Sequence, residues 1–207
     1  MKLDPFYLIV DDVTWLPRLL PVGVRLVQLR IKDEPPAEVR RQVVLAKGLC
    51  RQAGACLIVN DYWQIALDEG CDFVHLGQSD LDSADVSALQ REGVRLGIST
   101  HSHEELDRAL TFSPDYVALG PIYPTTLKVM PWAPQGLDRI AEWKRRIAPI
   151  PLVAIGGLTV ERLPDVFRAG ADSAAVVSDV LRNPAPELRA QQWISATREA
   201  MVQRENS

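Results

Sequence analysis

Short apolar runs rich in β-branched residues alternate along the chain with longer stretches whose apolar residues recur at helical spacing. This alternation is typical of repeated βα units around a parallel sheet. We predict strands at eight of the runs, which are Phe6–Val10, Arg25–Arg30, Cys56–Val59, Phe73–Leu76, Arg95–Ile98, Tyr116–Leu119, Leu152–Ile155 and Ser173–Val177.

The predicted helices lie between these strands, at Pro36–Gln52, Asp82–Glu92, Glu104–Leu110, Leu137–Ile147 and Val160–Ala169. The last of them has Thr159 at the N-cap position and Gly170 just past its end, as a helix requires. Eight strands with interleaved helices favour an α/β fold of the closed (β/α)₈ TIM-barrel type. A doubly wound open sheet is the alternative, and it usually has fewer strands.

No linker or low-complexity tract divides the chain, so residues 1–207 are predicted to form a single barrel domain. The polar segment 199–207 is expected to fray at the C-terminus. The longest irregular stretch runs from residue 121 to residue 136 and contains four prolines. Loops of this length in compact α/β domains are usually functional.

Composition and charge argue against nucleic acid and anionic membranes as binding partners. Hydrophobic residues make up 47% of the chain, and 23 Lys and Arg against 27 Asp and Glu give a formal charge of −4. Such a balance creates no general attraction for nucleic acid or for an anionic membrane. The N-terminus lacks the apolar core of a signal peptide and no apolar run is long enough to span a bilayer, so we expect a cytoplasmic protein. Small-molecule substrates are the expected partners, and a homo-oligomer is left open.

Polar residues follow nearly every predicted strand, at the end of the barrel where TIM-barrel active sites lie. Gln28, Arg30 and Lys32 fall at alternate positions, and period-two alternation places their side chains on one face of the strand. The alternative is a solvated strand end. The remaining strand-end candidates are Asn60, Asp61, Gln78, Asp80, Ser99, Thr125, Thr126, Lys128, Gly156, Gly157, Val177 and Ser178.

Asp61 and Asp80 follow two adjacent strands, so their carboxylates are expected at one rim of the barrel. Mg²⁺ takes one or two protein carboxylates and completes its octahedron with water and substrate phosphate. Helix capping is the alternative role for each acid. With Arg30, Lys32 and Lys128 nearby, one Mg²⁺ would leave a formal surplus of about three positive charges, which suits a diphosphate ester.

Gly156 and Gly157, together with Val177 and Ser178, lie where barrels commonly bind phosphate through backbone N–H groups. A tight turn is the alternative explanation for the two glycines. The spacing of His101 and His103 could suggest zinc, but no third ligand is recognisable. The spacing of Ser99 and His101 could suggest a hydrolase, but the nucleophile-elbow motif is missing.

Eight segments in register resemble the thiamine-phosphate synthase family over nearly the whole chain. They are Val27–Lys32, Asn60–Trp63, His75–Asp80, Gly97–His101, Gly120–Thr125, Ala133–Gly136, Ala154–Gly157 and Ala175–Ser178. The resemblance implies condensation of 4-amino-2-methyl-5-hydroxymethylpyrimidine diphosphate with a carboxythiazole or hydroxyethylthiazole phosphate. The products would be thiamine phosphate and diphosphate, formed through a carbocation-like pyrimidine.

The resemblance also assigns roles to residues. It implies that Asp61 and Asp80 bind one Mg²⁺ per active site, and that Arg30, Lys32, Ser99 and Lys128 are catalytic. The pyrimidine diphosphate would be bound by Gln28, Leu29, Arg30, Ile31, Lys32, Asn60, Ser99 and Lys128. The thiazole phosphate would be bound by Thr125, Thr126, Leu127, Gly157, Val177 and Ser178.

One position departs from the family pattern, because Leu127 stands where the family usually carries a threonine before the lysine. A hydroxyl that could bind phosphate is therefore missing, although Thr126 or a backbone N–H could replace it. Two other functions are weighed. A related thiazole tautomerase would not need the carboxylates or the diphosphate cations, and a sensor of thiamine phosphate would bind ligand without turnover.

Overall fold

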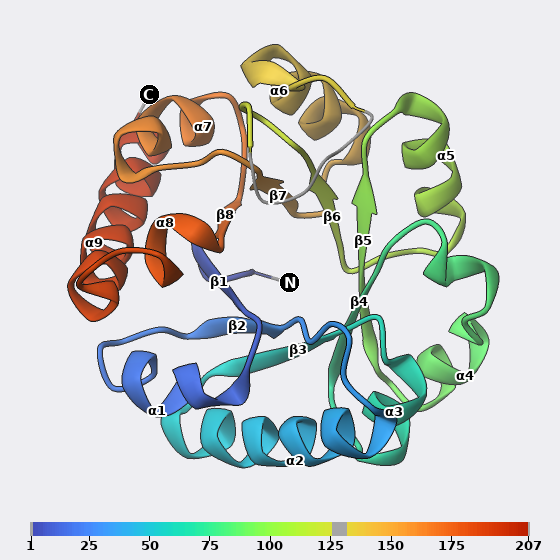
Figure 1. Ribbon diagram of the computed structural model, residues 1–207. Coiled ribbons are helices and arrows are strands. Elements are labelled where there is room, and N and C mark those ends of the chain that lie inside the picture. The colour runs from blue at the N-terminus through green and yellow to red at the C-terminus, as the bar shows by residue number, and fades with distance from the viewer. Residues whose placement is uncertain (1, 126–131, 207) are drawn as a thin grey trace.

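Eight parallel strands close into a barrel in the computed structural model of the chain, which describes residues 2–125 and 132–206 (Figure 1). Each strand pairs with its neighbours in chain order, and β8 closes the sheet against β1. The strands are β1 (Phe6–Val10), β2 (Leu26–Leu29), β3 (Cys56–Asn60), β4 (Phe73–Leu76), β5 (Arg95–Thr100), β6 (Tyr116–Leu119), β7 (Leu152–Ile155) and β8 (Ser173–Val176). The predicted (β/α)₈ barrel is confirmed.

Helices surround the strands in Figure 1 and follow them around the ring. They are α1 (Leu16–Leu19), α2 (Pro36–Ala53), α3 (Trp63–Asp68), α4 (Val86–Arg91), α5 (His103–Thr111), α6 (Gly136–Ile147), α7 (Leu163–Arg168), α8 (Ser178–Leu181) and α9 (Pro186–Glu205). Short 3-10 turns at Val13–Trp15, Asp80–Asp82 and Val160–Arg162 precede α1, α4 and α7.

Most predicted elements agree with the structure to within a few residues. The helix expected at Asp82–Glu92 begins late, at Val86, because the Asp85 side chain accepts a hydrogen bond from the Ala88 N–H and caps it there. Helices α1, α3, α8 and α9 were not predicted.

The C-terminal segment was expected to fray, but it is helical, since α9 continues to Glu205. Ala200 is buried on its inner face. Arg204 donates hydrogen bonds to the Ala171 carbonyl at 2.5 Å and to the Asp172 carboxylate at 3.1 Å. These contacts tie the last turn of the helix to the loop before β8, although the sequence there is polar.

Side chains alternate along each strand between the barrel interior and the layer under the helices. On β1, Tyr7 and Ile9 belong to the interior cluster, whereas Phe6, Leu8 and Val10 pack in the larger core against the helices. The same alternation on the other strands fills the barrel with side chains. The interior is therefore a packed core, and a cavity opens where the strands end.

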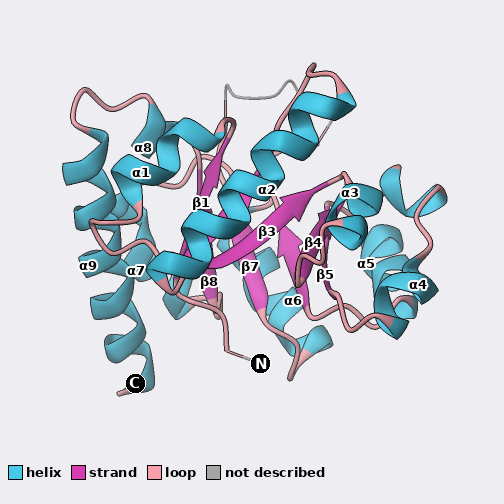
Figure 2. Ribbon diagram, turned by 90° about the horizontal axis from the view of Figure 1, so that it is seen from below, coloured by secondary structure: helices cyan, strands magenta, loops and turns pink. Residues whose placement is uncertain are grey.

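Figure 2 shows both chain termini at the same end of the barrel, where β1 begins. The carboxyl ends of the strands lie at the opposite end, which is the active-site end of this fold. Within residues 2–125 and 132–206, none of the helices combines the length and the apolar character that a membrane span requires.

Candidate active site

A cavity of about 830 Å³ opens at the carboxyl ends of the strands. This volume lies within the range of small-molecule sites. The cavity brings together most of the residues that the sequence analysis predicted for the site. Those that line it are Gln28, Arg30, Lys32, Asn60, Asp61, Gln78, Asp80, Ser99, Thr125, Gly156, Gly157, Val177 and Ser178.

The segment after β2 contributes alternate side chains to the cavity. Gln28, Arg30 and Lys32 line it, as the period-two pattern predicts. The side chains of Leu29 and Ile31 do not line it, and their predicted role in binding the substrate stays a prediction. They are only 1% and 2% exposed and pack in the core under the helices, because odd positions on this strand face away from the barrel axis.

Asp61 and Asp80 lie close together beside the cationic segment. Lys32 forms an ion pair with the Asp61 carboxylate. Burial raises the pKa of Asp80, and the neighbouring Asp61 carboxylate raises it further. The main chain of Asp61 is left-handed, with φ of 64°, an uncommon conformation for a residue other than glycine that occurs often at functional sites.

Neither carboxylate serves as a helix cap. Tyr62, and not Asp61, occupies the N-cap position of α3. One carboxylate oxygen of Asp80 accepts a hydrogen bond from the Gly77 N–H at 3.0 Å, which fixes the side chain over the turn after β4. Both carboxylates therefore retain oxygen atoms that can bind a cation.

The donor set suits a hard divalent cation with few protein ligands. Nowhere in the described part of the chain do three or more His, Cys, Asp or Glu side chains gather in a cluster that could bind a metal. Two adjacent carboxylates repel each other, and that repulsion is relieved by a cation. This is the arrangement expected for Mg²⁺, which retains water and substrate oxygens in its shell.

Two further polar groups face the same region and have no partner among the described residues. The buried Nδ2 of Asn60 makes no hydrogen bond within the described residues, and Asn60 is only 4% exposed. The Arg30 guanidinium has no hydrogen bond or ion pair that involves a described residue. Because buried polar groups are almost always hydrogen-bonded, the Asn60 amide points to a polar ligand in the cavity, and the partly exposed Arg30 offers positive charge beside it.

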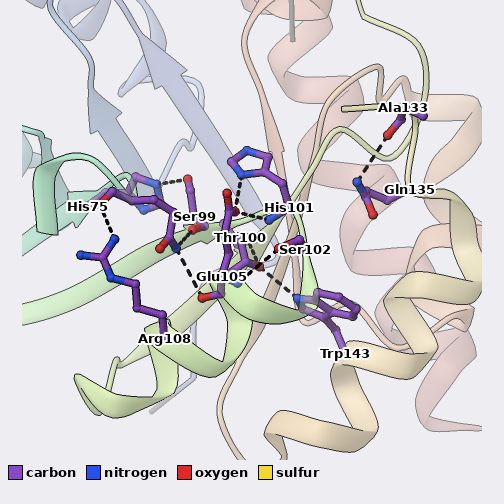
Figure 3. Close-up of polar contacts among 12 residues, drawn as sticks. His75, Ser99, Thr100, His101, Ser102, Glu105, Arg108, Ala133, Gln135 and Trp143 are labelled. Atoms are coloured by element: carbon purple, nitrogen blue, oxygen red, sulfur yellow. Dashed lines mark hydrogen bonds and ion pairs between the residues drawn. The ribbon is translucent and has the colours of Figure 1, made fainter. Parts of the chain in front are cut away.

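His75 is a cavity residue to which sequence reasoning gave no role. Its Nε2 lies 2.7 Å from the Ser99 hydroxyl, a contact drawn in Figure 3, and its Nδ1 lies 2.7 Å from the Tyr116 hydroxyl. Burial lowers the pKa of His75 to about 4, so the imidazole is neutral near pH 7. His75 lies two residues after Phe73 on β4, so the alternation of side chains along a strand places both on the same face and could have placed His75 inside the barrel.

His101 and His103 face different partners, which argues against the weighed zinc pair. The Nδ1 of His101 lies 2.7 Å from a Glu105 carboxylate oxygen, whereas the Nε2 of His103 lies 2.5 Å from a Glu142 carboxylate oxygen. Trp132 stacks on the His101 ring with centroids 5.8 Å apart. Figure 3 draws this contact between the His101 ring and the Glu105 carboxylate. The hydrolase hypothesis, which pairs Ser99 with His101, is also unsupported, because the Ser99 hydroxyl forms its hydrogen bond with His75.

The opposite side of the cavity is built from backbone. Gly156 and Gly157 follow β7 with φ of 97° and 65°. A Cβ on Gly156 would lie 2.6 Å from the Pro121 Cα, and one on Gly157 would lie 2.6 Å from the Pro124 carbonyl oxygen. The Tyr123 N–H bonds the Gly156 carbonyl at 3.0 Å. Only glycine permits this close packing of the two loops.

Three predicted site residues, Thr126, Leu127 and Lys128, lie outside the described residues. Thr125, Val177 and Ser178 line the cavity beside the glycines. Ser178 begins α8, a helix of one turn that is tied to α9 through Asp179, whose carboxylate accepts from Trp193 Nε1 at 2.6 Å.

Comparisons with known proteins agree with this geometry. Residues 6–180 match the family model described as thiamine monophosphate synthase. A thiamine-phosphate synthase of Rhizobium etli is 60% identical over 197 residues, which cover 95% of this chain and 97% of that protein. The Klebsiella pneumoniae protein of the same name is 47% identical over 92% of this chain and 87% of its own.

A solved structure supports the same assignment. The thiamine phosphate pyrophosphorylase from Pyrococcus furiosus superposes with a TM-score of 0.84 at 26% sequence identity, over 96% of this chain and 97% of that one. A family model that spans most of the chain and a relative at 60% identity establish the assignment. The chain belongs to the thiamine monophosphate synthase family, a family of transferases.

Proposed function

We propose that this chain joins 4-amino-2-methyl-5-hydroxymethylpyrimidine diphosphate to a thiazole phosphate in a reaction that depends on Mg²⁺. The C–O bond between the pyrimidine methylene and the diphosphate breaks, and a C–N bond to the thiazole nitrogen forms. Thiamine phosphate and diphosphate are the products. The observation that carries the proposal is a single cavity with paired carboxylates and cations on one side and a glycine-built backbone site on the other.

The side formed by β2 to β5 suits the pyrimidine diphosphate. Arg30 and Lys32 supply positive charge there, and Asn60 offers an unpartnered amide donor. Charge-assisted hydrogen bonds from such groups are the strongest contacts that a protein can make to phosphate oxygens. We assign Gln28 and Ser99 to the pyrimidine ring on this side, and Lys128 to the diphosphate by family resemblance.

Asp61 and Asp80 are the residues that would hold Mg²⁺. Bound there, the ion would neutralise negative charge that develops on the departing diphosphate. Lys32 now pairs with Asp61, so the lysine would turn to the diphosphate oxygens once a metal engaged the carboxylate. The raised pKa of Asp80 fits a carboxylate whose stable charged state needs a cation beside it.

The side formed by β6 to β8 suits a single phosphate. The left-handed glycines bring backbone close to any ligand in the turn after β7, and Ser178 places a hydroxyl and the start of α8 beside them. Backbone N–H groups in such turns bind phosphate without a side-chain charge. We therefore assign the thiazole phosphate to Thr125, Gly157, Val177 and Ser178.

Arg30 and Lys32 would stabilise the transition state more than the bound substrate, because diphosphate gains negative charge as the C–O bond breaks. No protein nucleophile is required for this route. The side chains instead hold the methylene carbon and the thiazole nitrogen in contact within a cavity that limits access of water.

A direct assay for the function measures diphosphate release from purified protein with both substrates and Mg²⁺. We expect release only when all three are present. The matched controls omit one substrate at a time. A protein that binds both ligands and releases no diphosphate would contradict the proposal and would indicate a sensor.

A further inference from the structure

Five side chains form a continuous line of hydrogen bonds through the barrel interior. The Gln28 Nε2 lies 2.7 Å from the Tyr7 hydroxyl, which lies 2.9 Å from the Tyr116 hydroxyl. The Tyr116 hydroxyl lies 2.7 Å from His75 Nδ1, and His75 Nε2 lies 2.7 Å from the Ser99 hydroxyl. The line thus joins β1, β2, β4, β5 and β6, and both of its ends reach the cavity.

The middle of this line is closed to solvent. Tyr7 is 1% exposed and Tyr116 is fully buried, and neither lines the cavity. Gly97 on the neighbouring strand makes room for the second ring, because a Cβ at that position would lie 2.1 Å from the Tyr116 Cζ. The His75 ring stacks on the same phenol at 5.6 Å. Buried hydroxyls in such a place must satisfy one another.

The number of protons fixes the direction of the line. Each hydroxyl carries a single proton. Because the Gln28 amide donates to Tyr7, the buried Tyr7 proton has an acceptor among the described residues only at the Tyr116 oxygen, so Tyr7 donates to Tyr116. Tyr116 must then donate to His75 Nδ1. The His75 ring is buried between two hydroxyls with no carboxylate in hydrogen-bond contact, and a neutral ring with an acceptor Nδ1 carries its proton on Nε2.

We propose that Tyr7, Tyr116 and His75 are positioning residues that form a one-way hydrogen-bond relay between Gln28 and Ser99. The relay uses one Gln28 amide N–H at Tyr7, which directs the nitrogen inward and turns the Gln28 Oε1 toward the cavity. At the other end the Nε2–H of His75 occupies a lone pair of the Ser99 oxygen, so the Ser99 proton points to the cavity. One end thus offers an acceptor and the other a donor.

The functional consequence rests on the proposed function. An aminopyrimidine carries an amino group that donates hydrogen bonds and ring nitrogens that accept them. The protein must therefore offer an acceptor to the amino group and a donor to a ring nitrogen. With the relay in place, the Gln28 Oε1 is held as the acceptor and the Ser99 hydroxyl as the donor before the ligand binds. Preorganised contacts of this kind cost less when the substrate binds.

Measuring which ring nitrogen of His75 carries the proton tests the relay in the absence of substrate. In protein labelled with ¹⁵N at histidine, NMR should show His75 protonated at Nε2 and unprotonated at Nδ1, with His75→Gln used to assign the signals. His101 provides an internal reference of the opposite kind, since its Nδ1 contacts Glu105. A His75 protonated at Nδ1 would overturn the proposal, because the line would then run in the other direction.

Tyr116→Phe keeps the buried ring and removes the donor to His75. We expect a mixed tautomer at His75 and a fall of about tenfold in kcat/KM for the pyrimidine diphosphate, the usual effect of one lost hydrogen bond, with KM for the thiazole phosphate unchanged. Tyr62→Phe is the matched control, because the Tyr62 side chain does not line the cavity.

The outcomes separate the relay from the proposed function. If the parent enzyme releases no diphosphate, the function fails, while the NMR result still decides the relay. If the parent is active and Tyr116→Phe matches Tyr62→Phe in both kinetics and His75 tautomer, the relay is wrong. A merely structural role would lower the melting temperature and affect both substrates equally, which also contradicts the proposal.

Discussion

The two sides of the cavity are built by different means. On the side of β2 to β5, the ligand-facing atoms belong to charged and amide side chains such as Arg30, Lys32 and Asp61. On the side of β6 to β8, they belong largely to loops whose close approach depends on Gly156 and Gly157. Charge on the first side can be changed by isosteric substitution, whereas the shape of the second side is changed most directly by altering its glycines.

This difference predicts two classes of variant. An isosteric change on the charged side should reduce catalysis and leave the fold intact, because leaving-group charge is stabilised there. A Cβ added on the backbone side should distort the loop and weaken one substrate selectively.

Asp80→Asn is expected to have the largest effect. It would remove one of the two proposed Mg²⁺ ligands and should lower kcat by about 100-fold or more, while the melting temperature stays near that of the parent. Steady-state diphosphate release and thermal unfolding provide the two measurements. Asp82→Asn is the control, since its side chain is 71% exposed in the same turn. A kcat near the parent value at ordinary Mg²⁺ would remove Asp80 from the metal site.

Gly157→Ala should raise KM for the thiazole phosphate by about tenfold and change KM for the pyrimidine diphosphate little, because the new Cβ collides with the Pro124 carbonyl. Gly54→Ala is the matched control. Gly54 has nearly the same φ, 63°, and no atom within 4 Å of an added Cβ. It should lose about 1 kcal/mol of stability and keep both KM values. If both variants raise KM for the thiazole phosphate equally, the effect comes from backbone strain and not from the collision at Pro124.

Trp132→Ala should have the smallest effect. The ring stacks on His101 across the rim, between the loop after β6 and the end of β5, and so links the two sides. Loss of one aromatic contact is expected to raise both KM values by about two- to fivefold. Steady-state titration of each substrate checks this. An effect on one substrate only would place Trp132 on a single side of the cavity.

The barrel could be predicted because its strands are short apolar runs bounded by clear turn residues. Phe6–Val10 and Tyr116–Leu119 were located with their observed bounds. The end of α9 could not, since Arg204 is anchored by contacts to a segment about 30 residues away in the chain. Tertiary contacts of this kind leave no local signal in a polar sequence.

The candidate site was predicted as far as polar residues or paired glycines mark the strand ends. Asp61 and Asp80 were found because carboxylates are conspicuous after apolar strands. Tyr7 and Tyr116 were missed, because a tyrosine inside an apolar run has the pattern of ordinary core. Leu29 and Ile31 were included through resemblance alone, against the alternation that places their side chains away from the cavity.

The central claim is that the metal serves one side of the cavity and not the other. Calorimetric titration of the ligand-free protein with inorganic diphosphate and, separately, with thiazole phosphate tests it most directly, in Mg²⁺ and again in EDTA. We predict that EDTA weakens diphosphate binding by about 100-fold or more and changes thiazole phosphate binding by less than about twofold. If EDTA weakens both ligands equally, or weakens neither, the division of the cavity into a metal-dependent and a backbone side is wrong.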